Sequence, residues 1–202
     1  AVDLKVKAFN PLDLGVKGRV TPASIPQMDM AFQLSTFSPR KLLKDLSEPF
    51  PIETADPRAM DKLSLKGSIN GTTERFSITD GQLILDDSRI SFFMDAGDLG
   101  KPVVSFDIKI DSINLDRYMP PAGSDGDKPS SPGTTPSQTE KEPGAAIDYA
   151  PLRIPLIKGT LSIENLTVQK AKLSDLDMKL ASSAGRYELD PVRLKAYDGT
   201  VT

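Results

Sequence analysis

The 202-residue sequence contains no cysteine, no histidine and no tryptophan. Without cysteine there can be no disulfide framework, no zinc–thiolate site and no thiol nucleophile. Without histidine there is no Ser-His-Asp triad, no common transition-metal site and no general base of the usual near-neutral kind. We therefore expect a protein that is not an enzyme, with no catalytic residues, no bound metal and no cofactor.

The sequence also lacks a strong charge imbalance and a long apolar run. Lys and Arg number 25 against 28 Asp and Glu, for a net charge of −3, and the two signs are interspersed. Since no basic stripe is available to neutralise phosphates, we expect no nucleic-acid partner. No segment approaches the roughly 18 apolar residues of a membrane-spanning helix, and there is no signal peptide.

Both ends of the sequence lie inside patterns typical of strands. The chain begins without Met at "AVDLKVKAF" and stops at "YDGTVT". We therefore expect a piece of a longer protein. The lack of an apolar run in this piece says nothing about whether the parent protein is anchored in a membrane.

What the sequence does contain is a regular alternation of apolar and charged residues. This period of two places successive side chains on opposite faces of a strand. About a dozen such strands, separated by turn signals, predict a mainly β protein with a twisted, largely antiparallel sheet. The apolar residues that we expect on one shared face are Leu4, Val6, Phe32, Leu34, Leu65, Ile69, Phe106, Ile108, Ile110, Leu176, Met178, Leu180, Val192 and Leu194.

Turn residues separate the predicted strands. Glycine and its preceding Asn or Asp can adopt the positive φ angles that tight reversals need. The predicted reversals are Asn70-Gly71, Asp80-Gly81, residues 97–100, Gly185 and Asp198-Gly199.

Only two short helices are expected. The first covers residues 39–46, with Ser38 as N-cap and Pro39 at the first helical position. The second is about one turn, residues 115–118, with Asn114 as its cap and prolines directly after it.

One pentapeptide pattern occurs three times: "VKGRV" (16–20), "LKGSI" (65–69) and "IKGTL" (157–161). In a strand its two aliphatic residues and its glycine share one face, and its lysine lies on the other. A glycine inside a strand permits a bend, a bulge or the close approach of another backbone. We interpret the pattern as a means of curving the sheet, in preference to a lysine that contacts a ligand head group.

A second repeat combines a strand, a cap and a short helix. "FQLSTFSPRKLL" (32–43) aligns without a gap onto "IKIDSINLDRYM" (108–119), cap residue on cap residue. Recurrence of this kind is typical of repeat architectures, in which each unit buries its apolar face by stacking on its neighbours.

One segment interrupts the pattern. Residues 120–147 are rich in Pro, Ser, Gly and charge and nearly free of large apolar residues, which predicts a flexible linker or loop. The sheet is expected to occupy residues 1–119 and to continue through residues 148–202.

Two kinds of motif suggest sites but have simpler interpretations. Asp86-Asp87, Asp95 with Asp98, and "SDGD" (124–127) bear carboxylates that calcium prefers, yet none has the spacing of a complete calcium loop. We expect solvated turns there. Asn70-Gly71-Thr72 and Asn165-Leu166-Thr167 match the glycosylation triplet, and the first is better explained as a hairpin turn.

The two helices are too small to cover the apolar face of a dozen strands. Soluble monomers rarely leave so large an apolar surface exposed, so something else must cover it. Either the sheet closes on itself as a sandwich, or it stays open as a curved groove that holds an apolar partner. At about 4.8 Å per strand, a dozen strands would make a groove of roughly 55 Å.

Three phrases, in this order, carry a family resemblance. They are "STFSPRKLLKDLSEPFPIETADPRAMDKLSLKGSINGT", "FDIKIDSINLDRYMPP" and "LIKGTLSIENLTVQKAKLSDLDMKLASSAGRYELDPVRLKAYDGTVT". Together they resemble the AsmA family of bacterial envelope proteins, over most of the chain outside residues 120–147.

The resemblance implies a place and a role. It implies a periplasmic protein tethered to the bacterial inner membrane by an N-terminal helix that precedes this piece, and a link to outer-membrane biogenesis. Relatives of that family, the TamB group and the eukaryotic chorein-type lipid bridges, are thought to conduct phospholipid acyl chains along an apolar groove. The family has no catalytic residues to transfer to this chain.

Three hypotheses follow. The first is a non-enzymatic segment that binds or conducts acyl chains of phospholipids or similar lipids against the shared apolar face. The second is a scaffold for envelope assembly, in which protein partners or a second sheet close that face. The third, a hydrolase that uses paired carboxylates such as Asp86 and Asp87, has no convergent acid pair in its favour.

Overall fold

The computed structural model describes residues 2–8, 12–97, 102–120, 156–183, 186–189, 193–196 and 199–201. In these residues the chain forms twelve strands and two short helices. The strands are β1 (Val2–Ala8), β2 (Leu12–Thr21), β3 (Gln27–Phe37), β4 (Leu63–Thr72), β5 (Arg75–Leu85), β6 (Ser88–Gly97), β7 (Val103–Asn114), β8 (Leu156–Val168), β9 (Ala171–Ser183), β10 (Arg186–Leu189), β11 (Arg193–Ala196) and β12 (Gly199–Val201). The helices are α1 (Pro39–Asp45) and the 3-10 helix η1 (Leu115–Arg117).

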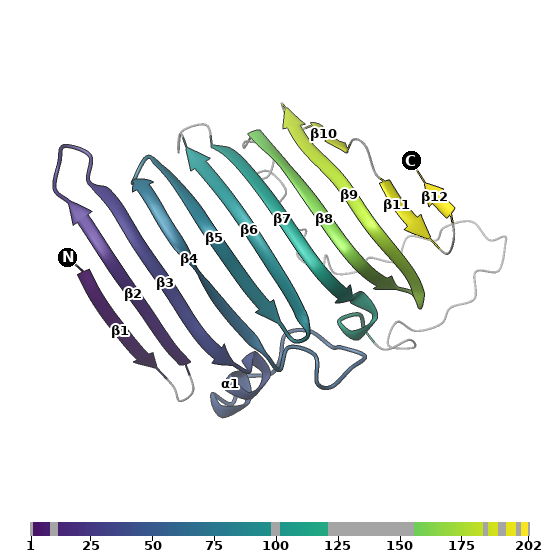
Figure 1. Ribbon diagram of the computed structural model, residues 1–202. Helices are drawn as coiled ribbons and strands as arrows, with labels where there is room; N and C mark the ends of the chain where they lie inside the picture. Colours follow the sequence, from purple (N-terminus) through teal and green to yellow (C-terminus); the bar gives the residue numbers. More distant parts are fainter. Residues whose placement is uncertain are drawn as a thin grey trace, which may run out of the picture.

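All twelve strands belong to one sheet (Figure 1). Its order follows the chain from β1 to β9 and continues with β11 and β12, while β10 pairs with β9. Each pairing among the described strands is antiparallel except that of β7 with β8, which is parallel. The strands after the predicted linker thus continue the sheet that precedes it. The linker itself, apart from Pro120, lies outside the described residues.

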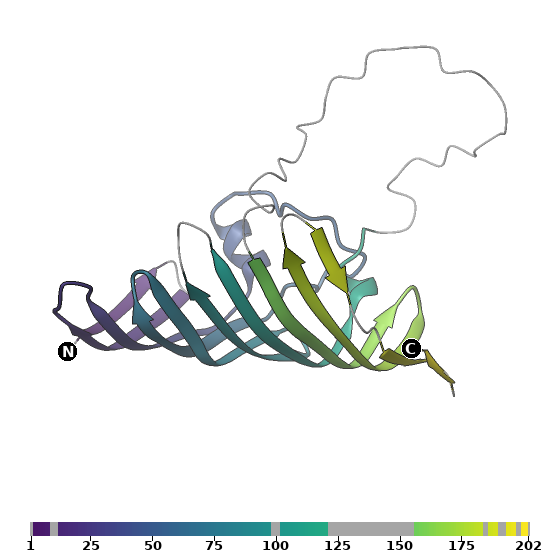
Figure 2. The same ribbon diagram turned by 90° about the horizontal axis from the view of Figure 1, so that it is seen from above.

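The sheet is curled but not closed. Figure 2 shows the strands bent into a trough that opens on the side where α1 lies. The prediction of a mainly β, largely antiparallel, open and curved sheet is confirmed, and the alternative of a closed sandwich is wrong. A sandwich would bury two facing apolar layers. Here no large side chain of the described residues is less than 2% exposed.

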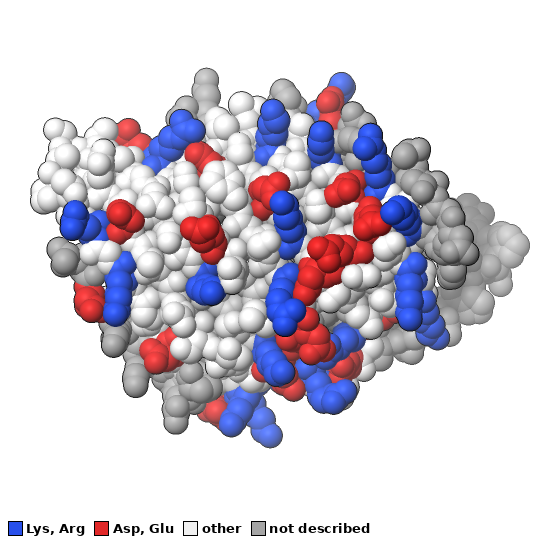
Figure 3. Space-filling model, viewed as in Figure 1, with Lys and Arg blue, Asp and Glu red and all other residues white. Residues whose placement is uncertain are grey.

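The alternation of the sequence gives the sheet two different faces. Residues that pair across neighbouring strands share a face. Leu65 pairs with Leu34 and Leu83, whereas its neighbour Lys66 pairs with Gln33 and Gln82. Figure 3 views the sheet from its outer, polar side, where Lys, Arg, Asp and Glu are distributed over the whole surface. The apolar face is therefore the inner face of the trough.

The hairpin between β4 and β5 lies three residues beyond its predicted position. Asn70-Gly71 is part of β4 and pairs with β5. The chain reverses at Thr73 and Glu74, where the Thr72 hydroxyl accepts a hydrogen bond of 3.2 Å from the Glu74 N–H. The hydroxyl side chain, rather than the Asn-Gly pair, therefore organises this turn.

The predicted reversal at Asp80-Gly81 is wrong, because these residues form a bulge inside β5. Lys66 pairs with Gln82 and Ser68 with Thr79, so Asp80 and Gly81 both lie opposite a single residue of β4, the glycine of "LKGSI". Asp80 does have the positive φ, 52°, that its type permits. A bulge bends its strand and increases its twist, which agrees with the interpretation of this pentapeptide as a curvature element.

The remaining predicted reversals are only partly described. Gly97 ends β6. Residues 98–100, Gly185 and Asp198 lie outside the described residues, and Gly199 begins β12.

Both predicted helices are present with their predicted caps. The Ser38 hydroxyl accepts a hydrogen bond of 3.1 Å from the Lys41 N–H at the start of α1. The Asn114 side chain accepts one of 3.1 Å from the Asp116 N–H at the start of η1. Both helices lie on the open side of the trough (Figure 2). None of the described helices is long and apolar enough to cross a membrane.

The most buried apolar cluster is small and lies near η1. Ile163, Leu166 and Leu176 are each 7–8% exposed. The partly buried residues packed against them are Ile110, Ile113, Leu115, Leu161, Val168, Leu173, Met178 and Leu194. Part of the inner face at β8 and β9 is therefore covered by protein, and Leu115 of η1 packs against it.

Candidate functional site

The inner face carries an unbroken line of aliphatic residues that crosses the first nine strands. Each member pairs with the next through the registry of neighbouring strands. We name this line the aliphatic ladder; its members are Val6, Leu14, Leu34, Leu65, Leu83, Ile90, Ile110, Ile163 and Leu176. Because it runs across the strands, it follows the long axis of the trough.

Two further lines run beside the aliphatic ladder on the same face. One consists of Leu4, Val16, Phe32, Gly67, Gly81, Phe92, Ile108, Leu161 and Met178. The other consists of Gly18, Met30, Ile69, Ile78, Met94, Phe106, Gly159 and Leu180. The inner face thus combines aliphatic side chains with phenylalanine and glycine.

The structure brings nearly all of the predicted apolar residues to this face. Twelve of the fourteen belong to the three lines, and Leu194 of β11 packs against the buried cluster at the same face. Val192 lies outside the described residues, and for Val6 only the backbone registry is described.

The exposure of the inner face changes along the trough. Leu4 in β1 is 51% exposed and Val20 in β2 is 38% exposed, whereas Ile163 and Leu176 at the other end are 7% exposed. The described part of the trough is therefore most open towards β1. An apolar ligand would find the largest accessible surface in β1 to β7.

The outer face offers a different kind of surface. One hollow of about 710 Å³ is lined largely by residues of that face, among them Lys158, Thr160 and Lys179. The Thr160 hydroxyl donates a hydrogen bond to Asp107, so cationic and anionic groups are mixed there. The hollow also includes Phe93, which is 41% exposed, so its lining is mixed in character. The inner face, with its continuous lines of apolar residues, is the candidate site.

Asp86, which the sequence suggests as a solvated turn, is instead a buried structural group. The residue is 7% exposed, and its carboxylate accepts hydrogen bonds from the N–H groups of Met60, Asp61 and Lys62 at 2.9–3.0 Å. The Tyr118 hydroxyl donates a fourth at 2.9 Å. The prediction of a solvated turn is therefore wrong for Asp86.

The hydrogen bonds around Asp86 change two pKa values. Burial raises the pKa of the Asp86 carboxyl, but the N–H groups of Lys62 and Met60 and the Tyr118 hydroxyl outweigh burial, and the pKa lies below its ordinary value. Burial and the adjacent carboxylate both raise the pKa of Tyr118 above its ordinary range. Tyr118 therefore remains a hydrogen-bond donor at any physiological pH.

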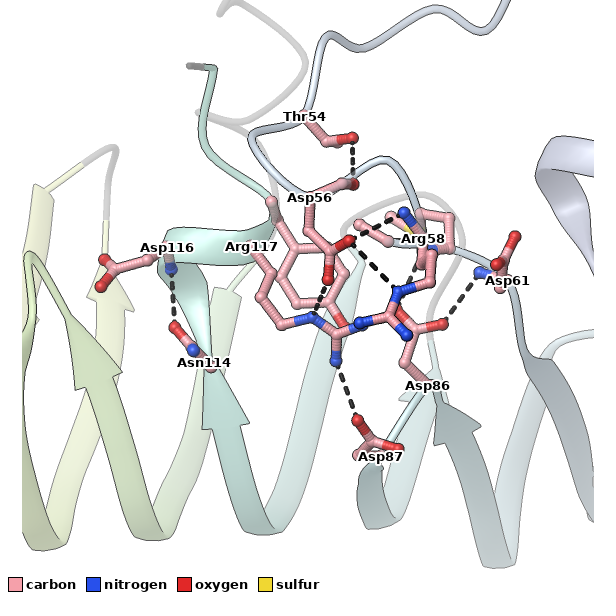
Figure 4. A network of polar contacts seen from close by, with 12 residues as sticks. Thr54, Asp56, Arg58, Asp61, Asp86, Asp87, Asn114, Asp116 and Arg117 are labelled. Carbon is pink, nitrogen blue, oxygen red and sulfur yellow. Dashed lines mark hydrogen bonds and ion pairs between the residues drawn. The ribbon is translucent and has the colours of Figure 1, made fainter. Parts of the chain in front are cut away.

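Arg117 of η1 contacts two other segments close to Asp86: the segment after α1 and the hairpin between β5 and β6 (Figure 4). We call these three segments the rim of the trough. The guanidinium of Arg117 lies 2.8 Å from the Asp56 carboxylate and 2.9 Å from that of Asp87. The N–H of Arg58 and the Arg117 guanidinium together hold the pKa of Asp56 below its ordinary value. Asp86 and Asp87 are thus each engaged with structural partners.

The rim contacts connect the two copies of the strand–helix repeat. The N–H groups of Ala55 and Asp56, in the segment after α1, donate to the carbonyls of Met119 and Arg117 beyond η1 at 2.7 and 3.2 Å. The described residues hold no group of three acidic side chains able to bind a metal ion. The hydrogen bonds therefore tie the segment after α1 to the residues at the end of η1.

Sequence reasoning missed about half of the inner face. Leu14, Val16, Met30, Leu83 and Phe92 lie on the three lines but were not among the predicted residues. Leu14 and Val16 lie in a run with the same period of two, whereas Leu83 and Phe92 are each followed by an apolar residue of the outer face, which obscures the alternation. The three-dimensional lines themselves depend on strand registry, which the alternation alone does not fix.

Comparison with protein-family models, with curated proteins and with solved structures finds no match.

Proposed function

We propose that this chain is a non-enzymatic segment that binds or conducts the acyl chains of phospholipids in the apolar trough. The observation that carries the proposal is the aliphatic ladder: nine aliphatic residues in registry, one from each of β1 to β9. Ile163 and Leu176 belong to the buried cluster, and the seven members from β1 to β7 span six steps of about 4.8 Å, roughly 29 Å. Such a length suits an extended acyl chain better than a compact small molecule.

The energetics of the inner face favour a flexible apolar ligand. Each CH₂ group removed from water contributes about 0.8 kcal/mol. Ten such groups against the ladder contribute roughly 8 kcal/mol before the entropic cost of association is subtracted. No dedicated polar site is therefore needed for the acyl part of the lipid.

The chemistry of the side chains supports a binding role over a catalytic one. The sequence supplies no His or Cys, and the carboxylates of Asp56, Asp86 and Asp87 are engaged in hydrogen bonds or ion pairs. The outer face carries the charges that keep the trough hydrated on that side (Figure 3).

The resemblance to the AsmA family supplies the proposed setting. On that basis the parent protein is anchored in the bacterial inner membrane by a helix N-terminal to this piece, and the trough lies in the periplasm. There it supports outer-membrane biogenesis by carrying phospholipid, together with envelope protein partners.

The test compares lipid retention in two variants that carry the same substitution on opposite faces. Leu34→Asp places a charge on the aliphatic ladder. Ile84→Asp places the same charge on the outer face, where Ile84 pairs with Ser64 and Arg89 and is 39% exposed. Each protein is purified from a membrane-containing bacterial lysate and examined by native mass spectrometry.

The expected result is added masses that match intact phospholipids on the wild type and on Ile84→Asp, and their loss from folded Leu34→Asp. Equal retention by both variants would exclude the inner face as the lipid site. If the wild type carries no lipid and binds no environment-sensitive apolar dye, the scaffold becomes the better explanation.

A further inference from the structure

Three glycines on the inner face lie beneath phenylalanine rings of the neighbouring strand. Gly67, Gly81 and Gly159 are buried, although each lies on a surface without a covering layer. Their registry partners or neighbours are Phe32, Phe92 and Phe106 respectively. Each ring thus covers the glycine on the strand beside it.

The geometry is clearest for Phe106 and Gly159. A Cβ atom placed on Gly159 would lie 2.5, 2.5 and 2.6 Å from three consecutive carbons of the Phe106 ring. A point outside the ring edge cannot be almost equally close to three consecutive ring carbons, so the ring presents its face to the glycine. The ring therefore lies flat against β8 and does not project into the trough.

Phenylalanine rings also lie close to the other two glycines, but through one or two ring carbons only. A Cβ on Gly81 would lie 2.6 Å from a ring carbon of Phe92. A Cβ on Gly67 would meet the tip of the Phe32 ring at 3.0 Å. Only glycine allows the rings to come so close to the sheet, a packing known from other strands in which an aromatic ring covers a glycine.

Two of these glycines are the centres of the repeated pentapeptides. Gly67 has Leu65 and Ile69 two positions away on either side, and Gly159 has Ile157 and Leu161. At about 3.4 Å per residue, the two flanking aliphatic side chains lie roughly 13 Å apart along the strand. On the inner face, each of these two pentapeptides therefore has a depression at its glycine, between two aliphatic side chains that project further from the sheet. We call this depression a low point.

We propose that these low points, with their flat rings, are seats in which single acyl chains cross the strands. The inference rests on the proposed function. The glycines set the depth of the trough at each seat, and the aliphatic residues on either side confine the acyl chain. A methyl group on Gly159 must displace the Phe106 ring, and the inner face is the side on which the ring can move away from β8.

The experiment measures binding of cis-parinaric acid, a fluorescent acyl-chain probe, to four proteins. These are the wild type, Gly159→Ala, the double variant Gly159→Ala/Phe106→Ala, and the control Gly15→Ala. Gly15 lies on the outer face, and a Cβ there would meet only the Gln33 carbonyl oxygen at 3.9 Å. Circular dichroism and thermal unfolding check that each protein is folded.

We expect Gly159→Ala to weaken probe binding about tenfold, the double variant to recover to within about threefold of the wild type, and Gly15→Ala to match the wild type. If Gly159→Ala binds the probe with wild-type affinity, the proposal of a seat is wrong. It is also wrong if the double variant folds but its affinity for the probe does not recover. Should Gly159→Ala not fold, the milder pair Gly67→Ala and Gly67→Ala/Phe32→Ala makes the same comparison.

An NMR measurement separates failure of the seat from failure of the proposed function. A ring that faces Gly159 shifts the Gly159 Hα resonances upfield whether or not lipid binds. If the wild type shows this shift but binds no probe, the proposed function is wrong and the seat has no ligand. If the wild type binds probe without the shift, lipid binding stands and the seat is wrong.

Discussion

The Tyr118 hydroxyl donates a hydrogen bond of 2.9 Å to the Asp86 carboxylate across 32 positions of the sequence. It joins the residue that follows η1 to the hairpin between β5 and β6. The loop after α1 donates three N–H groups to the same carboxylate. One buried carboxylate therefore holds three segments together: the residue after η1, the hairpin between β5 and β6, and the loop after α1.

Tyr118→Phe should lower the free energy of unfolding by about 1 kcal/mol. The substitution removes one hydrogen bond to a carboxylate that keeps three others. Urea denaturation at neutral pH measures the change. An unchanged midpoint would mean that the hydroxyl does not contribute to the stability of the rim.

Asp86→Asn should cost more, about 2–3 kcal/mol at neutral pH, because an amide presents donors to N–H groups that require an acceptor. Since the pKa of Asp86 is lower in the folded protein than its unfolded value of about 3.9, its contribution is fully present above that value and is lost as the pH falls below it. The difference in stability between wild type and variant should therefore shrink between pH 5 and pH 2. A difference that stays constant over this range would contradict the assigned role of the charge.

Ile163→Ala and Leu14→Ala remove side chains from the aliphatic ladder, each one position from an end. Ile163 is 7% exposed within the buried cluster, whereas Leu14 is only partly buried. We expect a loss of about 2–4 kcal/mol for Ile163→Ala and less than half of that for Leu14→Ala. Equal losses, measured by chemical denaturation, would show that the trough is covered along its whole length.

The hairpin between β8 and β9 can be stabilised. Gln169 and Lys170 have φ angles of 50° and 65°, a conformation that costs residues other than Gly, Asn and Asp about 1 kcal/mol or more. The double substitution Gln169→Asn and Lys170→Gly should therefore raise the free energy of unfolding by about 1 kcal/mol. Urea denaturation measures the change, and a loss of stability in the double variant would show that the positive φ angles are not a source of strain.

The alternation of side chains was sufficient to predict the two faces, because a strand has a strict period of two. It predicted that Ile108, Met178 and Leu180 share a face, which the registry confirms. It also predicted both caps, Ser38 and Asn114, since capping depends on residues only a few positions away.

Long-range pairings could not be predicted in this way. The ion pair between Arg117 and Asp56 spans 61 positions, and no local pattern marks either residue as its partner. The glycines of the pentapeptides illustrate the same limit. Their presence predicted bending or close approach, but only the registry of β7 with β8 places the Phe106 ring over Gly159.

The parallel pairing of β7 with β8 has a consequence for the order of folding. Asp107 and Thr160, which pair across these strands, lie 53 positions apart, whereas most other neighbouring strands are joined by short hairpins. Hairpins close quickly, and contacts between distant segments form slowly because a long loop must first lose its freedom. We therefore expect two arrays, β1 to β7 and β8 to β12, to form early and to join last. Loop-closure entropy grows only with the logarithm of length, so changes in the length of the connecting segment should alter the rate of that joining only modestly.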